Sequence, residues 1–375
     1  MKIVVASDSF KGSLSSLEVA QAVQIGVRQV LPDSEVVTVN VADGGEGTVE
    51  AIVQSLNGEI VVADVSDPLG RKITARYGIA KNTAVIEMAA ASGLPLLAKE
   101  ERDPWRTSTF GTGELIMDAI RRGCRHFLIG IGGSATNDAG IGMLYALGFR
   151  FYDKENILIE DCCGGRMKDI SRIDDSSVAE EVRQSIFTIA CDVDTPFCGA
   201  EGAAPVFAPQ KGADAEMVEK LDLGMQSLAQ VIANTYGIDL VSIAGTGAAG
   251  GMGGAFYAFL GATLQKGINM VLDAINFDMI INGADLVITG EGKIDFQTAK
   301  GKTAAGVLMR AKAKNIPVIA IGGCVEMCDE LSQMGFAGIY PILEENVPLE
   351  VAMQRDFAMN NITKTIARVL GSFPT

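Results

Sequence analysis

Short apolar runs alternate with helical patterns at the beginning of the chain. Residues 2–6 and 35–41 are rich in β-branched residues, and each run is followed by a polar turn and an amphipathic stretch. After the first turn, Ser15 and Glu18 have the spacing of a helix capping box, and apolar residues recur at helical spacing as far as Pro32. The pattern predicts two strand-helix units.

The alternation of predicted strands and helices stops at about residue 58 and resumes near residue 284. Between them lie shorter strands separated by turns, of which 67–70 is typical of a hairpin. We therefore expect two α/β domains. Residues 1–60 and 284–375 form one of them, and residues 61–283 form a second domain inserted between these segments.

A glycine-rich turn between a predicted strand and a predicted helix is the most distinctive stretch of the chain. The glycines allow close backbone approach, and the first turn of the helix adds unpaired N–H donors, so the stretch is suited to holding a phosphate. A carboxylate beside a phosphate calls for a cation, which makes Asp138 a candidate Mg²⁺ ligand. An ordinary turn capped by Asp and Asn remains the alternative. The other candidates in this turn are Gly132, Gly133, Ser134, Thr136 and Asn137.

Further polar turns follow other predicted strands, at the edge where open α/β sheets bind ligands. Some of them carry carboxylates that could bind Mg²⁺ or act in catalysis, and others carry lysines that could neutralise phosphate or a small carboxylate. Arg71 is a weaker candidate for the carboxylate. The turn candidates are Asp8, Ser9, Lys11, Asp43, Asp192, Lys211, Gly290, Glu291, Lys293 and Asp295.

The two standard nucleotide fingerprints do not explain these turns. The P-loop pattern is absent, since Phe296 stands where its first glycine would be. Residues 245–250 satisfy G-x-G-x-x-G, but the segment after the following helix continues in helical spacing, where a dinucleotide fold needs a strand ending in an acid. An NAD-dependent dehydrogenase remains a competing interpretation.

Composition limits the partners of the chain. Lysine and arginine total 31 against 46 aspartates and glutamates, a net charge of −15, which argues against nucleic acid or an anionic membrane surface. There is no signal-peptide pattern and no long apolar span, so we expect a cytoplasmic monomer or homodimer. Seven cysteines without C-x-x-C spacing indicate reduced thiols, and the single histidine, His126, is expected to be structural.

Eight motifs in order resemble the bacterial type I glycerate kinase family. They are DSFKGSLSS, ADGGEGT, GTGELI, GIGGSATNDAGIGMLYALG, CDVDTPFCGAEGAA, FAPQKGA, GTGAAGGMGGA and TGEGKID followed by Q and T. The resemblance implies a Rossmann-like parallel-sheet domain built from both chain ends, an inserted mixed α/β domain, and an active site in the cleft between them. It also implies transfer of the ATP γ-phosphoryl group to D-glycerate. Ala139 stands where the family usually has glycine, and Thr195 where asparagine is common.

Combining the resemblance with the chemistry of phosphoryl transfer gives each candidate a role. We expect 2-phosphoglycerate as product; the alternatives are glycerate 3-kinase activity, a dehydrogenase, or a nucleotide- or metabolite-binding protein without catalysis. The expected roles are catalysis by Asp192, Lys211 and Asp295; substrate binding by Asp8, Ser9, Lys11 and Arg71; ATP binding by Gly132, Gly133, Ser134, Thr136, Asn137, Gly290, Glu291 and Lys293; and Mg²⁺ binding by Asp138, Asp43 and Glu291.

Overall fold

The chain folds into two compact units. The computed structural model describes residues 1–45, 47–343 and 347–372, so residue 46 of the predicted ADGGEGT turn lies outside the described residues. Unit 1 consists of Met1–Leu56 and Ile268–Thr375, and unit 2 of Asn57–Gly267. Both contain a sheet with helices, which confirms the predicted α/β class.

The return to unit 1 comes earlier in the chain than the expected residue 284. Two helices that precede residue 284 are held against α13 (Thr303–Lys312) of unit 1. They are α10 (Gly267–Ala274) and α11 (Phe277–Ile280). Arg310 on α13 donates hydrogen bonds to Asp273 at 2.6 Å and to Asp278 at 2.8 Å. Helical spacing alone could not show this, because these contacts join residues far apart in sequence.

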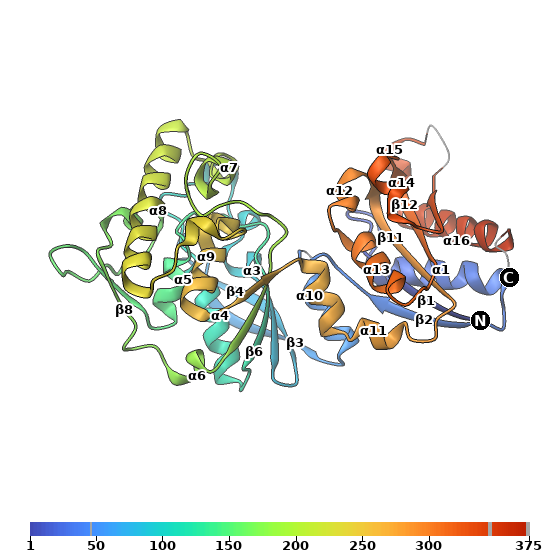
Figure 1. Cartoon of the computed structure of the whole chain (residues 1–375), viewed down its shortest axis with the longest axis horizontal. Coiled ribbons are helices and arrows are strands. Elements are labelled where there is room, and N and C mark those ends of the chain that lie inside the picture. The colour runs from blue at the N-terminus through green and yellow to red at the C-terminus, as the bar shows by residue number, and fades with distance from the viewer. Residues whose placement is uncertain (46, 344–346, 373–375) are drawn as a thin grey trace. The chain divides into compact units, whose positions relative to one another are not determined.

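Unit 1 has a sheet of five parallel strands in the order β13-β12-β11-β1-β2, visible in Figure 1. Every strand pair in it is parallel, as the predicted strand-helix units require. The strands are β1 (Lys2–Ser7), β2 (Glu35–Asn40), β11 (Leu286–Ile294), β12 (Val318–Val325) and β13 (Gly338–Pro341).

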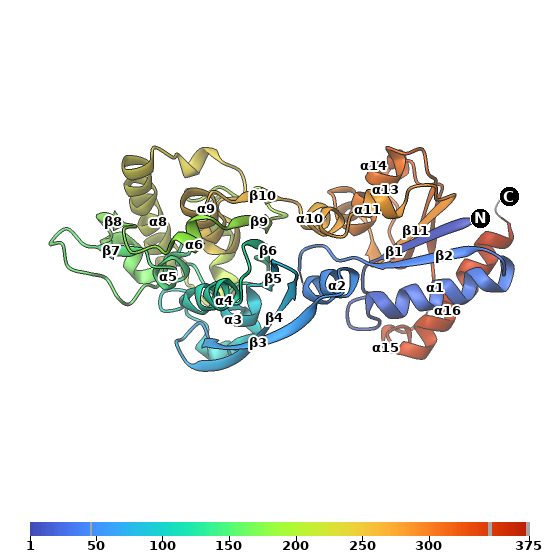
Figure 2. The same ribbon diagram turned by 90° about the horizontal axis from the view of Figure 1, so that it is seen from below.

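Helices cover both faces of this sheet (Figure 2). Ile3 and Val5 pack into one core with α1 (Ser16–Val30) and α16 (Arg355–Gly371), while α13 contacts β1, β11 and β12. The predicted capping box is present, since Glu18 N donates to Ser15 Oγ and the Glu18 carboxylate accepts from Ser15 N. The other helices of the unit are α2 (Thr48–Ser55), α12 (Phe296–Ala299), α14 (Asp329–Met334) and α15 (Leu349–Ala352).

Unit 2 has a mixed sheet of six strands in the order β10-β9-β6-β5-β4-β3. The predicted hairpin at 67–70 joins two antiparallel strands, and Asp67 N donates to Arg71 O across it. The strands are β3 (Glu59–Ser66), β4 (Lys72–Ala80), β5 (Thr83–Glu87), β6 (His126–Gly130), β9 (Ile186–Ala190) and β10 (Thr263–Gln265), with a separate pair formed by β7 (Arg150–Tyr152) and β8 (Arg172–Asp174).

One hydrophobic core fills unit 2. Phe127 on β6 stacks on Phe187 on β9 with ring centroids 4.8 Å apart, and Phe256 lies 6.1 Å from Phe187. These contacts hold β6 and β9 side by side, so the chain leaves both strands at the same edge of the sheet. The helices of the unit are α3 (Ala89–Ser92), α4 (Phe110–Arg121), α5 (Ile141–Ala146), α6 (Glu180–Arg183), α7 (Ala203–Phe207), α8 (Ala215–Tyr236) and α9 (Ala248–Leu260).

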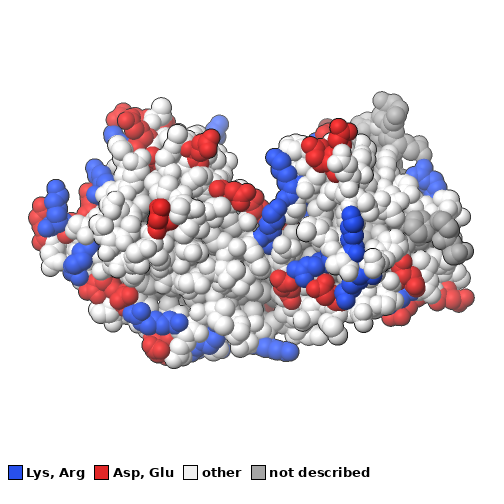
Figure 3. Space-filling view, viewed as in Figure 1, with Lys and Arg blue, Asp and Glu red and all other residues white. Residues whose placement is uncertain are grey.

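Charged side chains of both signs lie on the surface. On the face drawn in Figure 3, Lys and Arg side chains form small groups interspersed with Asp and Glu. Within the described ranges, we find no helix with the length and apolar character needed to cross a bilayer.

Candidate active site

A cavity of about 340 Å³ lies in unit 1, where the chain leaves β1, β11 and β12. It brings together six of the residues singled out from the sequence, although they come from segments as far apart as residues 8 and 293. These are Asp8, Ser9, Lys11, Asp43, Glu291 and Lys293. The carboxyl edge of the parallel sheet is therefore the best-formed candidate site of this unit.

Asp8 follows β1 and is only 6% exposed. Its carboxylate accepts hydrogen bonds from Ser9 N at 2.7 Å and from Thr303 Oγ1 at 2.9 Å. Burial, followed by the negative charge of Asp43, raises the pKa of Asp8 to about 6. The cavity thus holds a carboxyl group that is harder to ionise than an exposed aspartate.

Glu291, on β11, is the second buried carboxylate of the cavity. Its Oε1 accepts from Ala304 N at 2.8 Å, at the beginning of α13. Burial raises the pKa of Glu291 to about 7, and the charges of Asp8 and Asp43 add to this effect. Two carboxyl groups of the same cavity therefore titrate near neutral pH, which is common in catalytic and ligand-binding sites.

Lysines provide the opposing charge. Lys11 lies 3.5 Å from Asp43, and Lys302 lines the same cavity. Lys293 contacts Asp295 at 3.3 Å and Glu326 at 2.9 Å. Asp295 also caps α12 by accepting from Gln297 N, so the predicted catalytic aspartate is held at a helix end next to a cavity lysine. The lysines are side chains that an anionic ligand could recruit.

The glycine-rich turn of unit 2 has a different structure. Asp138 has no exposed surface, and its carboxylate accepts hydrogen bonds from Thr109 N, Thr109 Oγ1, Gly140 N and Gly142 N at 2.7 to 3.3 Å. The carboxylate therefore joins the turn to the first turn of α4 and to α5. In this position the carboxylate stabilises the fold of unit 2. Its role as a Mg²⁺ ligand stays a prediction.

Lys211 lies beneath the same turn and is 1% exposed. Its Nζ donates to Ser134 Oγ at 2.7 Å and to the Thr136 carbonyl at 2.6 Å, and burial lowers the pKa of Lys211 to about 7. Thr136 and Asn137 have no exposed surface either. Lys211 therefore holds the turn in place, and its role toward phosphate stays a prediction. Of the residues predicted in this turn, only Gly132 and Gly133 are exposed.

The remaining predicted residues of unit 2 are on the surface. Asp192, which follows β9, is exposed, and its Oδ1 accepts from Gly267 N at 3.0 Å. Arg71 contacts Asp67 at 2.5 Å and Glu101 at 2.7 Å, so its guanidinium is already engaged by two carboxylates. A substrate would have to compete with them for it.

The G-x-G-x-x-G stretch at 245–250 serves internal packing. A Cβ on Gly247 would lie 2.0 Å from the Pro196 carbonyl oxygen, and one on Gly250 would lie 2.2 Å from that of Thr136. These glycines are buried against backbone of their own unit, which disfavours the dehydrogenase interpretation.

Three features of these regions carried no sequence signal. Thr303, which bonds to Asp8, and Thr109, which bonds to Asp138, are single hydroxyls reached only through the fold. One wall of the cavity is apolar and includes Leu349 and Met353, which read as ordinary positions of a C-terminal helix.

Comparison with known proteins supports the family resemblance noted from the sequence motifs. The model of the glycerate kinase family matches residues 3–373. Glycerate kinase from Bacillus cereus is 45% identical, covering 98% of this chain and 97% of that protein, and glycerate 2-kinase from Escherichia coli K12 is 44% identical, covering 98% of each.

A solved structure agrees with these relatives. The crystal structure of a protein assigned as glycerate kinase 2 from Salmonella typhimurium LT2 matches with a TM-score of 0.89 and 45% identity, covering 98% of this chain and 97% of that one. The chain therefore belongs to the glycerate kinase family and is an ATP-dependent kinase.

Proposed function

We propose that this enzyme transfers the γ-phosphoryl group of ATP to the 2-hydroxyl of D-glycerate with the help of Mg²⁺, giving 2-phosphoglycerate. The observation that carries the proposal is the unit 1 cavity, where Asp8, Asp43 and Glu291 lie opposite Lys11 and Lys302. Phosphoryl transfer requires carboxylates for the metal and cations for the phosphates, and the cavity supplies both.

The carboxylates of the cavity fit a divalent cation. The negative charge of Asp43 raises the pKa values of both Asp8 and Glu291, so the three carboxylates repel one another. Within the described part of the chain, no three Asp, Glu, His or Cys side chains are grouped closely enough to hold a metal alone. Mg²⁺ commonly takes one or two carboxylates and completes its shell with water and substrate phosphates, which agrees with this arrangement. When bound, it would neutralise charge developing on the transferred group.

The lysines divide between the two anionic substrates in our proposal. Lys11 is 63% exposed and lies in the turn after β1, where it can turn from Asp43 to the carboxylate of glycerate. Lys293 and Lys302 are assigned to the phosphates, together with the backbone at Gly290. At Lys293, phosphate would replace Glu326, whose side chain is 62% exposed, and Asp295, whose side chain is 12% exposed.

We also propose that unit 2 takes part in the same reaction. Asp192 is assigned to orienting the attacking hydroxyl, because it is an exposed carboxylate at the end of a central strand. The Asp192→Asn variant should lower kcat by roughly 100-fold with little change in the KM for ATP, as expected for a transition-state interaction. An equal rise in both KM values with kcat unchanged would remove Asp192 from this role.

The choice of the 2-hydroxyl is supported by the similarity to the Escherichia coli protein named glycerate 2-kinase. Two substrate analogues test it. D-lactate keeps the carboxylate and the 2-hydroxyl, whereas 3-hydroxypropionate keeps the carboxylate and only the 3-hydroxyl. We expect MgATP-dependent phosphorylation of D-lactate and none of 3-hydroxypropionate.

Phosphorus NMR of the product formed from D-glycerate gives the direct answer. The phosphorus should couple to the single C2 proton. Coupling to the two C3 protons would show a 3-kinase, and the absence of any ADP with MgATP and D-glycerate would overturn the proposed function as a whole.

A further inference from the structure

The unit 1 cavity has an apolar side that D-glycerate does not explain. Glycerate is a three-carbon acid with an oxygen on every carbon, so it has almost no apolar surface to bury. A cavity of about 340 Å³ falls at the lower end of the range of about 300–1,000 Å³ that takes drug-sized ligands. The apolar side, which we call the apolar wall, consists of Phe10, Ile342, Leu343, Leu349, Ala352, Met353 and Ala358.

The apolar wall is built mainly by α15 and the beginning of α16. Leu349 is 74% exposed and Met353 is 36% exposed, so both present apolar surface to solvent in the absence of a ligand. Covering apolar surface stabilises a complex by about 25 cal/mol per Å². The wall therefore favours a ligand group with an apolar face.

The turn after β1 connects the apolar wall to the lysines. Phe10 and Leu14 exchange backbone hydrogen bonds at 2.8 and 3.0 Å, which closes a tight turn containing Gly12 at φ +79°. A Cβ on Gly12 would lie 2.8 Å from the terminal methyl of Met353. The methionine is thus packed directly on the turn that carries Lys11.

One polar atom beside the wall lacks a partner. Ser13 Oγ is buried and makes no hydrogen bond within the described ranges, although Ser13 lines the cavity. Buried hydroxyls in native proteins nearly always have partners. A ligand with both an apolar ring and polar edges would satisfy this atom and cover the wall at once.

We propose that unit 1 binds the nucleoside part of ATP, with the adenine ring against Leu349 and Met353 and the phosphates toward Lys293 and Lys302. The flat faces of a purine match an apolar wall, and methionine sulfur makes favourable contacts with aromatic rings. Ser13 Oγ then forms a hydrogen bond to the base or the ribose. This inference rests on the proposed ATP-dependent function and identifies which part of the molecule holds the nucleotide.

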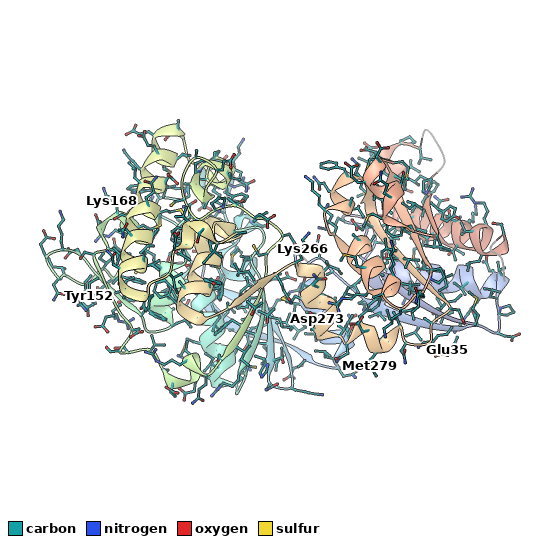
Figure 4. All side chains as sticks on the ribbon, in the orientation of Figure 1. Glu35, Tyr152, Lys168, Lys266, Asp273 and Met279 are labelled. Carbon is teal, nitrogen blue, oxygen red and sulfur yellow. The ribbon has the colours of Figure 1, made fainter. Side chains whose placement is uncertain are left out.

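Calorimetric titration of the full-length enzyme with MgADP, without glycerate, tests the inference. Leu349→Asp and the uncharged Met353→Ser should each weaken MgADP binding at least fivefold. Both sites are partly exposed, so neither change threatens the core. Met279→Asp is the matched control, since Met279 lies on α11 of the same unit, is 74% exposed, does not line the cavity, and is labelled in Figure 4.

Binding of inorganic tripolyphosphate distinguishes the contribution of the phosphates from that of the base. Met353→Ser should leave tripolyphosphate binding within twofold of wild type while it weakens MgADP, because only the nucleotide contacts the wall. The KM for D-glycerate should also stay within twofold. Equal weakening of both ligands would place the phosphates, and not the base, at Met353 and would overturn the assignment.

The outcomes distinguish this inference from the proposed function. If D-glycerate is phosphorylated but both wall variants bind MgADP as tightly as wild type, the nucleoside does not lie on the wall and the kinase function stands. If MgADP binding depends on the wall but D-glycerate is not phosphorylated, the nucleotide site stands and the substrate assignment falls.

Discussion

The end of β11 in unit 1 and the turn after β6 in unit 2 have similar sequences and different structures. Both contain glycines beside a carboxylate, but Glu291 lies within β11, which continues to Ile294 where a turn was predicted, whereas Asp138 lies in a turn after β6. In unit 1, Glu291 lines a cavity and has a raised pKa near 7, whereas in unit 2 Asp138 is sealed by four hydrogen bonds. Glycines beside a carboxylate can therefore line a cavity in one place and hold the fold together in another.

The two carboxylates differ because they have different hydrogen-bond donors around them. The Glu291 carboxylate accepts from Ala304 N at 2.8 Å and, more weakly, from Thr298 Oγ1 at 3.5 Å, and two other carboxylates share its cavity. Asp138 meets the N-terminal ends of α4 and α5, whose unpaired N–H groups stabilise a negative charge. A site that leaves a buried carboxylate poorly satisfied has a free-energy cost that a ligand can remove.

The largest effect is expected for Glu291→Gln. If the cavity is the reactive site, kcat/KM should fall by roughly 100-fold or more, because a carboxylate needed for the metal is lost. The free energy of unfolding should stay equal or rise, since the buried negative charge is removed. Glu326→Gln is the control, because its side chain is 62% exposed and it contacts Lys293 only at the surface. Full activity in Glu291→Gln would show that Glu291 is not needed for the reaction.

The opposite result is expected for Asp138→Ala. Removing the carboxylate leaves the Thr109, Gly140 and Gly142 donors unsatisfied in a buried region, so urea denaturation should show a loss of roughly 3–5 kcal/mol. Asp161→Ala, at a carboxylate that is 73% exposed, should stay within about 0.5 kcal/mol of wild type. An Asp138→Ala enzyme with unchanged stability and no activity would show that the turn of unit 2 is a reactive site.

The free energy of unfolding should depend on pH through Lys211. Burial lowers the pKa of Lys211 from 10.5 to about 7, so between these values the unfolded chain binds more protons than the folded one. The stability of the wild type should therefore rise from about pH 7 toward pH 10, by at most about 1.4 kcal/mol per pH unit. Lys211→Met should lack this rise in urea denaturation, while Lys220→Met, at an exposed lysine, should keep it. Parallel curves for wild type and Lys211→Met would show that Lys211 is not held in a low-pKa environment.

The smallest effect is expected at Ala139, in the glycine-rich turn of unit 2. Ala139 has φ +50°, a left-handed conformation that costs an alanine roughly 1–2 kcal/mol. Ala139→Gly should relieve this cost, offset in part by the greater entropy of the unfolded chain, and raise the Tm by roughly 1–3 °C. Ala135→Gly, in the same turn but without a positive φ, should lower the Tm instead. A lower Tm for Ala139→Gly would show that the methyl group packs well enough to outweigh the strain.

The amino-acid sequence by itself determined the local elements and the family. Strand-helix alternation, the Ser15 and Glu18 capping box and the hairpin at 67–70 were predicted and confirmed, because each depends on residues a few positions apart. The motifs were enough to identify the family, which the family model and relatives confirm over nearly the whole chain.

Only the tertiary structure decided which polar turns are open and which are closed. Asp8, Asp43 and Glu291 meet because three strands of one parallel sheet end at the same edge, and Lys211 is buried because Ser134 and Thr136 fold over it. The exposure and the pKa of a side chain depend on neighbours that are distant in sequence. A glycine-rich turn with a carboxylate therefore predicts a place where the chain can bind an anion or a cation, and the packing around it determines whether that place remains available to a ligand.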